Sequence, residues 1–332
     1  MGAFLLTHLL ELNSKNRVSA SMALRHPYFC TVDQMRETNF NGTATSSPPA
    51  PYTDQLTPTQ HLMRMENKYI RDRLPYNQHV DRVTRAYLVD WLIEVVDVFD
   101  TDSRCVYLAM DFFSQFLGTR LIEPGKYQLA AAACIHIASK CEKNIIFAKF
   151  ISITDLLFCA DNTFQQDDVI HMENTLLDAI NFQIYNPIIF DFITLYVEHL
   201  EHGMLQLFHL ANGTSMNKAL WMARYISDLA LQSDLCRTYA PSLIATCVVS
   251  LALYCLGQER DVVFSEKLHQ VSGYESRDMQ TCIIDLWDNI EYFRISLSKL
   301  KMISQGYNRK EKEFVSKIRI LNPNDLFQRR VT

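Results

Sequence analysis

The residue types that most often carry catalysis or metal binding are present in this sequence but are not arranged for either. Ten histidines and nine cysteines are scattered along the chain, without a C-x-x-C pair or a histidine–cysteine cluster at zinc spacing. His199, His202 and His209 do not recur beside carboxylates at ligand spacing, so we interpret them as surface histidines. No acid–base pair or nucleophilic triad is recognisable. We therefore expect no enzymatic activity, no metal and no cofactor.

A charged arc runs along an otherwise apolar helical pattern at residues 83–99. On a helix of about 100° per residue, Asp90, Glu94 and Asp97 share one narrow arc. Apolar side chains fill most of the remaining circumference: Tyr87, Leu88, Val89, Trp91, Leu92, Ile93, Val95, Val96 and Phe99. Such a helix must be covered on two sides, either by its own domain twice or by its domain and another protein.

Arg85 lies inside the apolar part of this pattern, beside Leu92 and Val96. Its guanidinium group stays protonated, and leaving it buried without a partner costs roughly 3–5 kcal/mol. The fold must therefore bring a carboxylate to Arg85.

Composition indicates a helix-rich protein with large cores. The chain has 332 residues, 48% of them apolar, with only nine glycines and ten prolines, and its length favours two folds and a tail. A net charge of −5 gives no sign of a nucleic-acid or anionic-membrane surface. No run of about 18 apolar residues suggests a membrane span. The scattered cysteines are typical of reduced thiols in a nuclear or cytosolic protein.

Helical patterns recur in two series. The first follows residues 83–99 with segments at 104–117, 124–141, 154–159 and 165–180; the second comprises 187–210, 216–231, 239–256, 263–270 and 278 onward. A shift of 114 residues places Leu129 on Leu243, Ala131 on Ala245, Ala138 on Ala252 and Cys141 on Cys255. We interpret this as a degenerate duplication of a five-helix unit with a central helix rich in small residues. Lys140 falls on Tyr254, so we expect only the first repeat to bind a partner.

The run R-A-Y-L-V-D-W-L-I-E-V at residues 85–95 resembles the opening helix of the cyclin box, closest to the mitotic A- and B-type cyclins. Residues 58–74 resemble the helix that precedes the box, which packs across the box and touches the kinase, and the family match extends to residue 323. The resemblance implies an all-α protein of two tandem five-helix cyclin-box folds preceded by an N-terminal helix. The boxes would span 58–186 and 187–323, followed by a tail at 324–332.

The resemblance also implies a kinase-binding face. In cyclins the equivalents of Lys140 and Glu173 lie side by side and bond the backbone and the reoriented helix of the kinase, while Phe182 and Ile184 match apolar contacts. Two positions depart from the family, because Cys141 replaces an aromatic residue and Lys143 replaces a glutamate. The loop at 144–152 is also longer than in A-type cyclins. We expect a divergent kinase partner.

A second implied site is the groove that grips R-x-L motifs of substrates and inhibitors. Leu88, Trp91, Glu94 and Gln128 match its positions, whereas Thr84, Tyr87 and Tyr127 replace aliphatic residues. The alternative is that these side chains simply pack the core. The family partner of Arg85 is an aspartate where this chain has Ser114, so we predict that Asp111, one turn earlier, pairs with Arg85 instead.

The first 37 residues carry a different resemblance. L-L-x-L-N-S-K-N-R-V-S-A-x-x-A-L-x-H-P-Y-F within residues 4–30 is similar to the last two helices of a cyclin-dependent kinase catalytic domain. The sequence has no glycine-rich phosphate loop, H-R-D or D-F-G, so it cannot transfer phosphate itself. The segment is either the trace of a kinase–cyclin fusion or mis-joined gene, or a chance amphipathic hairpin. Residues 38–57 are polar and proline-rich, which predicts a disordered linker.

We therefore expect an activating subunit of a cyclin-dependent protein kinase that controls mitosis and the cell cycle, recruits substrates and is found in nucleus and cytoplasm. One alternative is a general transcription-initiation factor, which shares the duplicated fold but binds DNA; the acidic net charge argues against it. The other is a decoy that binds a kinase without activating it, consistent with Cys141 and Lys143.

Overall fold

The computed structural model describes residues 57–72, 80–142, 150–204, 216–257, 262–297 and 300–323. Within these ranges the chain is helical and contains no strand, as the sequence predicts. The kinase-like segment 1–37, nearly all of the linker 38–57, and the tail 324–332 lie outside the described residues, and so does Lys143.

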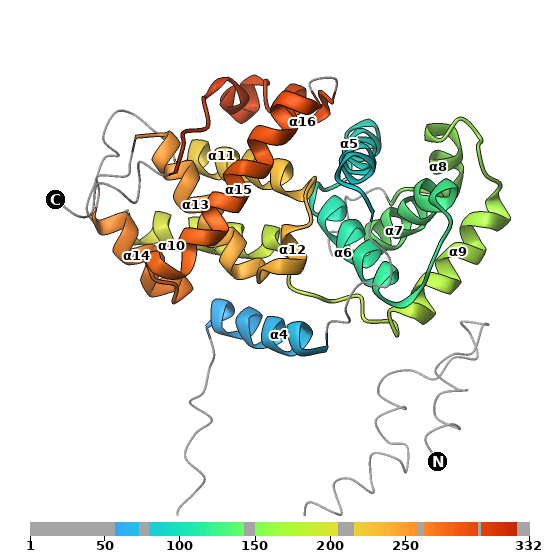
Figure 1. Cartoon of the computed structure of the whole chain (residues 1–332), viewed down its shortest axis with the longest axis horizontal. Helices are drawn as coiled ribbons and strands as arrows, with labels where there is room; N and C mark the ends of the chain where they lie inside the picture. The colour runs from blue at the N-terminus through green and yellow to red at the C-terminus, as the bar shows by residue number, and fades with distance from the viewer. Residues whose placement is uncertain are drawn as a thin grey trace, which may run out of the picture. The chain divides into compact units, whose positions relative to one another are not determined.

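The first repeat is built around a central helix, α7 (Tyr127–Cys141). Around it lie α5 (Arg82–Val98), α6 (Arg104–Thr119) and α9 (Gln166–Ala179), and the short α8 (Ile153–Cys159) packs on α9 (Figure 1). The alanines at 130–133 and 138 are all fully buried. Because their side chains are small, three neighbouring helices approach the α7 backbone closely.

The second repeat has the same plan around α13 (Pro241–Cys255). Its neighbours are α10 (Ile189–Met204), α11 (Met216–Leu231), α14 (Val262–Ser272) and α15 (Ser276–Ser296), and the short α12 (Leu235–Thr238) precedes it. Both central helices have 15 residues, and both ends of α13 lie 114 residues beyond those of α7. The duplication predicted from the sequence is therefore present in the fold. Tyr254 is buried in α13, whereas its counterpart Lys140 is exposed.

Helix α4 (Pro58–Asp72) bridges the two repeats rather than packing on the first alone. It lies against α10 and α13 of the second repeat. The buried Glu66 carboxylate accepts hydrogen bonds from the backbone N–H of Ser242 at 2.7 Å and from its hydroxyl at 2.6 Å. The Tyr69 hydroxyl donates to Asp111 of α6 at 2.6 Å.

The segment at 301–318 lies across both repeats: its helix packs on α5 and α11, and its last turn packs on α11. It contains α16 (Met302–Gly306) and the single turns Lys310–Lys312 and Val315–Lys317. Asp90 of α5 accepts the backbone N–H of Met302 at 3.2 Å, and Asp97 pairs with Arg309 at 2.7 Å. Helices α6 and α7 cover another side of α5. The wide apolar surface predicted for residues 83–99 is therefore covered by the protein's own chain on two sides. On the second side, Asp90 and Asp97 of the charged arc bind the segment around Met302 and Arg309.

Arg85 does not pair with Asp111, so that prediction is wrong. Its Nε donates to the carbonyl oxygens of Leu231 at 3.3 Å and Ser233 at 2.9 Å, at the end of α11. The last carbonyls of a helix lack intrahelical donors and carry the negative end of the helix dipole, so they can receive a guanidinium without a carboxylate. The nearest carboxylate, Asp234, is 3.8 Å from Nη1 and partly exposed.

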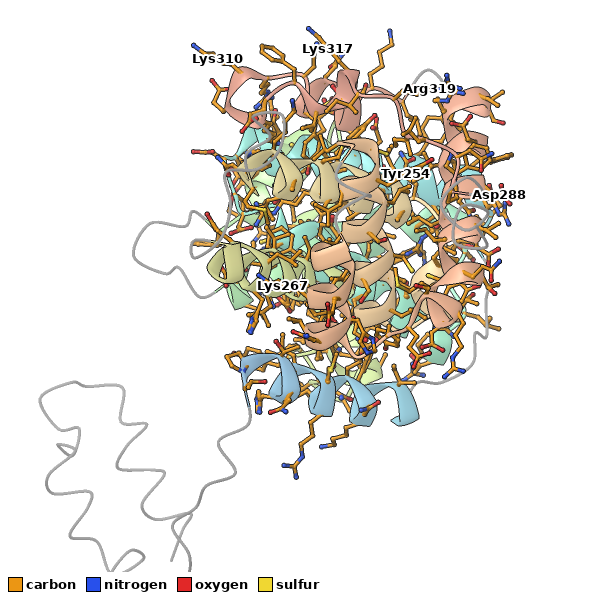
Figure 2. All side chains as sticks on the ribbon, turned by 90° about the vertical axis from the view of Figure 1, so that its left-hand side faces the viewer. Tyr254, Lys267, Asp288, Lys310, Lys317 and Arg319 are labelled. Carbon is orange, nitrogen blue, oxygen red and sulfur yellow. The ribbon has the colours of Figure 1, made fainter. Side chains whose placement is uncertain are left out.

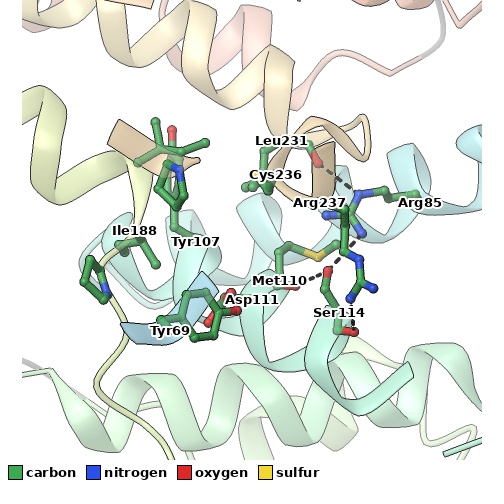
Figure 3. Close-up of a pocket in the computed structure, with 13 residues that line it drawn as sticks. Tyr69, Arg85, Tyr107, Met110, Asp111, Ser114, Ile188, Leu231, Cys236 and Arg237 are labelled. Carbon is green, nitrogen blue, oxygen red and sulfur yellow. Dashed lines mark hydrogen bonds between the residues drawn. The ribbon is translucent and has the colours of Figure 1, made fainter. Parts of the chain in front are cut away.

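Asp111 is occupied by other donors. Besides Tyr69, it accepts hydrogen bonds from Gln115 at 2.9 Å and from Asn186 at 3.0 Å. Arg85 instead donates to the Ser114 hydroxyl at 3.3 Å (Figure 3). Arg85 therefore joins the first repeat to the second through backbone acceptors.

Candidate functional site

The structure brings Lys140 and Glu173 together. Lys140 lies in the last turn of α7 and Glu173 lies in the middle of α9, and the Lys140 ammonium donates a hydrogen bond to Glu173 Oε1. The Lys140 side chain is 41% exposed and that of Glu173 17%, so both reach the surface. A partner can therefore meet a matched donor and acceptor that come from two different helices.

Local sequence fixes where α9 begins and hence where Glu173 points. Gln165 and Asp168 form a reciprocal cap at the start of α9, with the Asp168 carboxylate accepting the Gln165 N–H at 2.8 Å. Lys140 lies at the C-terminal end of α7, where a cation is favoured by the helix dipole. The capped start of α9 sets the helix that carries Glu173, and the end of α7 favours the charge of Lys140, before any partner binds.

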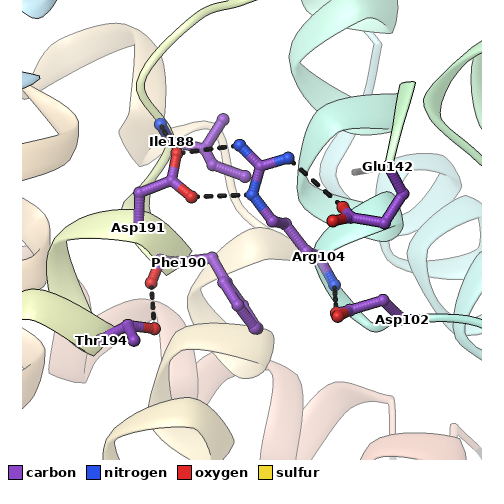
Figure 4. A network of polar contacts seen from close by, with 7 residues as sticks. All are labelled: Asp102, Arg104, Glu142, Ile188, Phe190, Asp191 and Thr194. Carbon is purple, nitrogen blue, oxygen red and sulfur yellow. Dashed lines mark hydrogen bonds and ion pairs between the residues drawn. The ribbon is translucent and has the colours of Figure 1, made fainter. Parts of the chain in front are cut away.

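A charged network ties the end of α7 to the second repeat (Figure 4). Arg104, the first residue of α6, makes two hydrogen bonds to Asp191 of α10, at 2.7 Å and 3.1 Å. Its Nη1 lies 3.4 Å from Glu142 Oε2, and Glu142 is buried directly after α7. These contacts fix the position of Glu142 and hence of the turn that follows Lys140. None of Arg104, Glu142 and Asp191 was predicted from the sequence.

The apolar residues predicted for the same face differ in exposure. Phe182 is 65% exposed and lies with Asn181 in a left-handed turn after α9, with φ values of 55° and 51°. Ile184 is partly buried against the core. Cys141 is half-buried, and burial is the main cause that raises the pKa of its thiol. Phe182 is thus the predicted contact that offers the largest apolar surface.

His136 is a buried polar residue that the sequence reading missed. It lies one turn before Lys140 on α7, and its Nε2 is 3.7 Å from Glu173 Oε2. Its Nδ1 lies 2.7 Å from the carbonyl oxygen of Ile151. Burial lowers the pKa of His136 below its usual range. The spacing of four residues between His136 and Lys140 was the available signal that the two share a helix face.

The predicted docking groove on α5 is only partly open. Tyr87 is 49% exposed and Glu94 is exposed, so both are available to a partner. Trp91 is half-buried, and its indole N–H donates to the carbonyl oxygen of Cys159 in α8 at 3.3 Å. Thr84 and Gln128 are half-buried as well.

Two of the groove positions belong to the core. Leu88 and Tyr127 are each only 7% exposed, and the Tyr127 ring packs edge-on against Phe113. Leu88 and Tyr127 therefore pack the core, as the alternative interpretation expects. The surface open to a docked peptide is smaller than it would be if all the matched positions were exposed.

The described ranges offer neither a metal site nor a membrane span. Among those residues no group of three or more His, Cys, Asp or Glu side chains is placed to hold a metal ion. Over the same part of the chain, every helix is too short or too polar to span a bilayer.

Two family models match this chain in succession. Residues 55–185 match the cyclin N-terminal domain, and residues 187–321 match the cyclin C-terminal domain. The chain is 26% identical over 253 residues to the G2/mitotic-specific cyclin-A of Hydra viridissima, covering 76% of this chain and 54% of the relative. It is 30% identical over 237 residues to the G2/mitotic-specific cyclin C13-1 of Daucus carota, covering 68% and 63%.

A third relative, cyclin-A2 of Bos taurus, is 29% identical over 268 residues, covering 79% of this chain and 56% of the relative. The chain thus spans little more than half the length of two of these curated relatives and 63% of the third. Among solved structures, a viral cyclin from herpesvirus saimiri superposes with a TM-score of 0.55 at 16% identity, over 69% of this chain and 96% of that one. That superposition supports the fold.

Proposed function

Since this chain belongs to the cyclin family, with relatives among the mitotic A-type cyclins, we propose that it is the regulatory subunit of a cyclin-dependent protein kinase. Its role is not catalytic. The observation that carries the proposal is the Lys140–Glu173 pair, because two helices of the first repeat present a partly exposed donor and acceptor side by side.

The pair is suited to bind backbone groups of a partner helix. The ammonium group has three donors, one of which is used by Glu173 Oε1. The second carboxylate oxygen faces the neutral His136 ring and remains able to accept a further N–H. Charge-assisted bonds of this kind are strong when a partner excludes water around them. The exposed Phe182 supplies apolar area on the segment that follows α9.

Activation follows from unequal affinity for two kinase states. A regulatory subunit that binds the active arrangement of a kinase more tightly than the inactive one shifts the population toward the active one. A shift from about 1:99 to about 99:1 requires roughly 5.5 kcal/mol of differential binding. In this proposal, the contacts of Lys140, Glu173 and Phe182 supply this difference in binding free energy.

The open part of the α5 groove is the proposed site for R-x-L motifs of substrates or inhibitors. Glu94 would pair with the arginine of the motif, and the half-buried Trp91 and the exposed Tyr87 would contact its leucine. We expect weak docking, because Leu88 and Tyr127 are committed to the core.

The test is to purify the chain with candidate cyclin-dependent kinases and to measure both binding and histone phosphorylation. Lys140→Ala and Glu173→Ala are expected to weaken binding at least about tenfold, since each leaves a charge unpaired in the interface. Lys310→Ala is the matched control, because Lys310 is also an exposed lysine (Figure 2) but lies next to Arg309, which pairs with Asp97 of α5. Wild-type affinity in all three variants would overturn the proposed interface.

Two outcomes would favour the alternatives. Kinase binding without histone phosphorylation would identify a decoy. Salt-dependent retardation of DNA, in the absence of kinase binding, would identify a DNA-binding relative of the transcription-initiation factors.

A further inference from the structure

His136 lies directly beneath the proposed kinase-contact pair and is only 6% exposed. Its two ring nitrogens face two different acceptors. Nδ1 is 2.7 Å from the Ile151 carbonyl oxygen, and Nε2 is 3.7 Å from Glu173 Oε2. Ser139 secures the same segment, because its hydroxyl donates to the His136 carbonyl at 2.9 Å and accepts the Ile151 N–H at 3.1 Å. The ring therefore has a fixed position behind Glu173.

These contacts determine where the proton of the neutral ring lies. A bare nitrogen at 2.7 Å from a carbonyl oxygen would be repelled, so Nδ1 carries the proton and donates to Ile151. Nε2 of the neutral ring is then an acceptor that faces a carboxylate oxygen, and no hydrogen bond can form between them. Glu173 Oε2 has no hydrogen-bond donor among the described residues in this state, while Oε1 is held by Lys140.

We propose that His136 is a positioning residue for the kinase-contact pair, and that its protonation draws Glu173 Oε2 inward and withdraws it from the partner. When Nε2 gains a proton it becomes a donor, and the 3.7 Å contact can close into a charge-assisted hydrogen bond. The inference rests on the proposed kinase-binding function, and it predicts that kinase affinity falls as the solution is acidified.

The electrostatic surroundings of the ring are simple. From its own helix, the Lys140 ammonium opposes protonation, and from α9 the Glu173 carboxylate favours it. The segment before α8 contributes the Ile151 carbonyl. Burial acts against the charged ring and lowers the pKa of His136. The ring is therefore neutral near pH 7 and takes up its proton in a more acidic range.

The first test needs no kinase. The ring signals of the ten histidines of the full chain are followed by NMR against pH, and that of His136 is assigned from its loss in His136→Asn. In the Glu173→Gln chain, the midpoint of the His136 titration is expected to fall, because the carboxylate that favours the charged ring is gone. An unchanged midpoint would overturn the inference whether or not a kinase binds.

The second test measures kinase affinity at several pH values, from about 7.5 down to below the midpoint that NMR gives for His136, so that the window includes the lowered pKa of the ring. The wild-type chain is expected to lose about three- to tenfold in affinity, the size of one competing hydrogen bond. His136→Asn keeps a donor at the Nδ1 position for the Ile151 carbonyl but has no group that reaches Glu173, so it is expected to bind with a flatter profile. Far-UV circular dichroism at each pH confirms that both chains remain folded.

The outcomes separate the two proposals. If the kinase binds and both chains show the same pH profile, the positioning role of His136 is wrong and the proposed function stands. If neither chain binds any candidate kinase at neutral pH, the proposed function fails, while the NMR titration still decides whether His136 and Glu173 are coupled.

Discussion

Replacing Arg85 with methionine tests the contact that joins the two repeats. Methionine keeps an unbranched apolar stem in a position that is only 3% exposed, so the packing of the stem is largely retained. What is lost is the guanidinium group, which donates to the carbonyl oxygens of Leu231 and Ser233 and to the Ser114 hydroxyl. The variant therefore isolates the polar part of the contact.

The expected loss follows from the groups left behind. A buried acceptor that loses its donor costs about 1–3 kcal/mol, and two carbonyl groups are affected. The cost of breaking a buried ion pair, roughly 3–5 kcal/mol, is an upper bound because Asp234 is 3.8 Å away and its side chain is 35% exposed. We expect Arg85→Met to lower the free energy of unfolding by about 3 kcal/mol and the melting temperature by about 6–12 °C.

The assay is urea denaturation followed by far-UV circular dichroism. Asp234→Asn is the matched control, since a partly exposed carboxylate at 3.8 Å contributes under about 1 kcal/mol. The reasoning fails if Arg85→Met stays within about 0.5 kcal/mol of the wild-type chain. It also fails if Asp234→Asn is as damaging as Arg85→Met, because the carboxylate would then be the true partner.

Three further predictions concern other buried polar contacts. Glu66→Gln should lower the free energy of unfolding by about 2 kcal/mol and speed amide hydrogen exchange in α4, because Ser242 donates two hydrogen bonds to this carboxylate. Lys68→Gln on the same helix is the control and should leave the exchange rates unchanged. Tyr307→Phe should lower the free energy of unfolding, measured by urea denaturation, by about 1–2 kcal/mol, since the Tyr307 hydroxyl donates to the buried Asp228 at 2.8 Å. Tyr292→Phe removes the hydroxyl from a more exposed ring and should leave stability unchanged. His136→Asn should make the free energy of unfolding less sensitive to acid. Because the pKa of His136 is lowered in the folded chain, the unfolded chain binds the proton first, and the stability of the wild-type chain falls as the pH drops below about 6.5. Equal losses of stability in both chains on acidification would refute this.

The helical framework was predictable from the sequence because it depends on local patterns. Small residues mark both central helices, and the shift of 114 residues that aligns Ala138 with Ala252 also aligns the observed ends of α7 and α13. Lys140 and Glu173 lie side by side, as the family resemblance implies. Their role in binding a kinase stays a prediction.

The errors and omissions concern contacts between distant backbone segments. Arg85 was expected to pair with Asp111, but its nearest carboxylate is Asp234 at 3.8 Å. Its closest acceptors are carbonyl groups 146 and 148 residues away, and a carbonyl group leaves no mark on the sequence. His136 was overlooked because its neighbours at 130–139 are apolar or small, and because one of its two partners is the carbonyl group of Ile151. The cover of α5 by residues around Met302 likewise depends on a turn of the chain that no local pattern encodes.

The return of the chain onto α5 has a consequence for synthesis. Asp90 leaves the ribosome long before its partner Met302, which follows 212 residues later. The same separation of 212 residues divides Asp97 from Arg309. Until then, the nascent first repeat carries an incompletely covered helix, to which a chaperone has time to bind. A polypeptide released before this segment emerges would keep most of its helices yet lack the clasp that holds its opening helix in place.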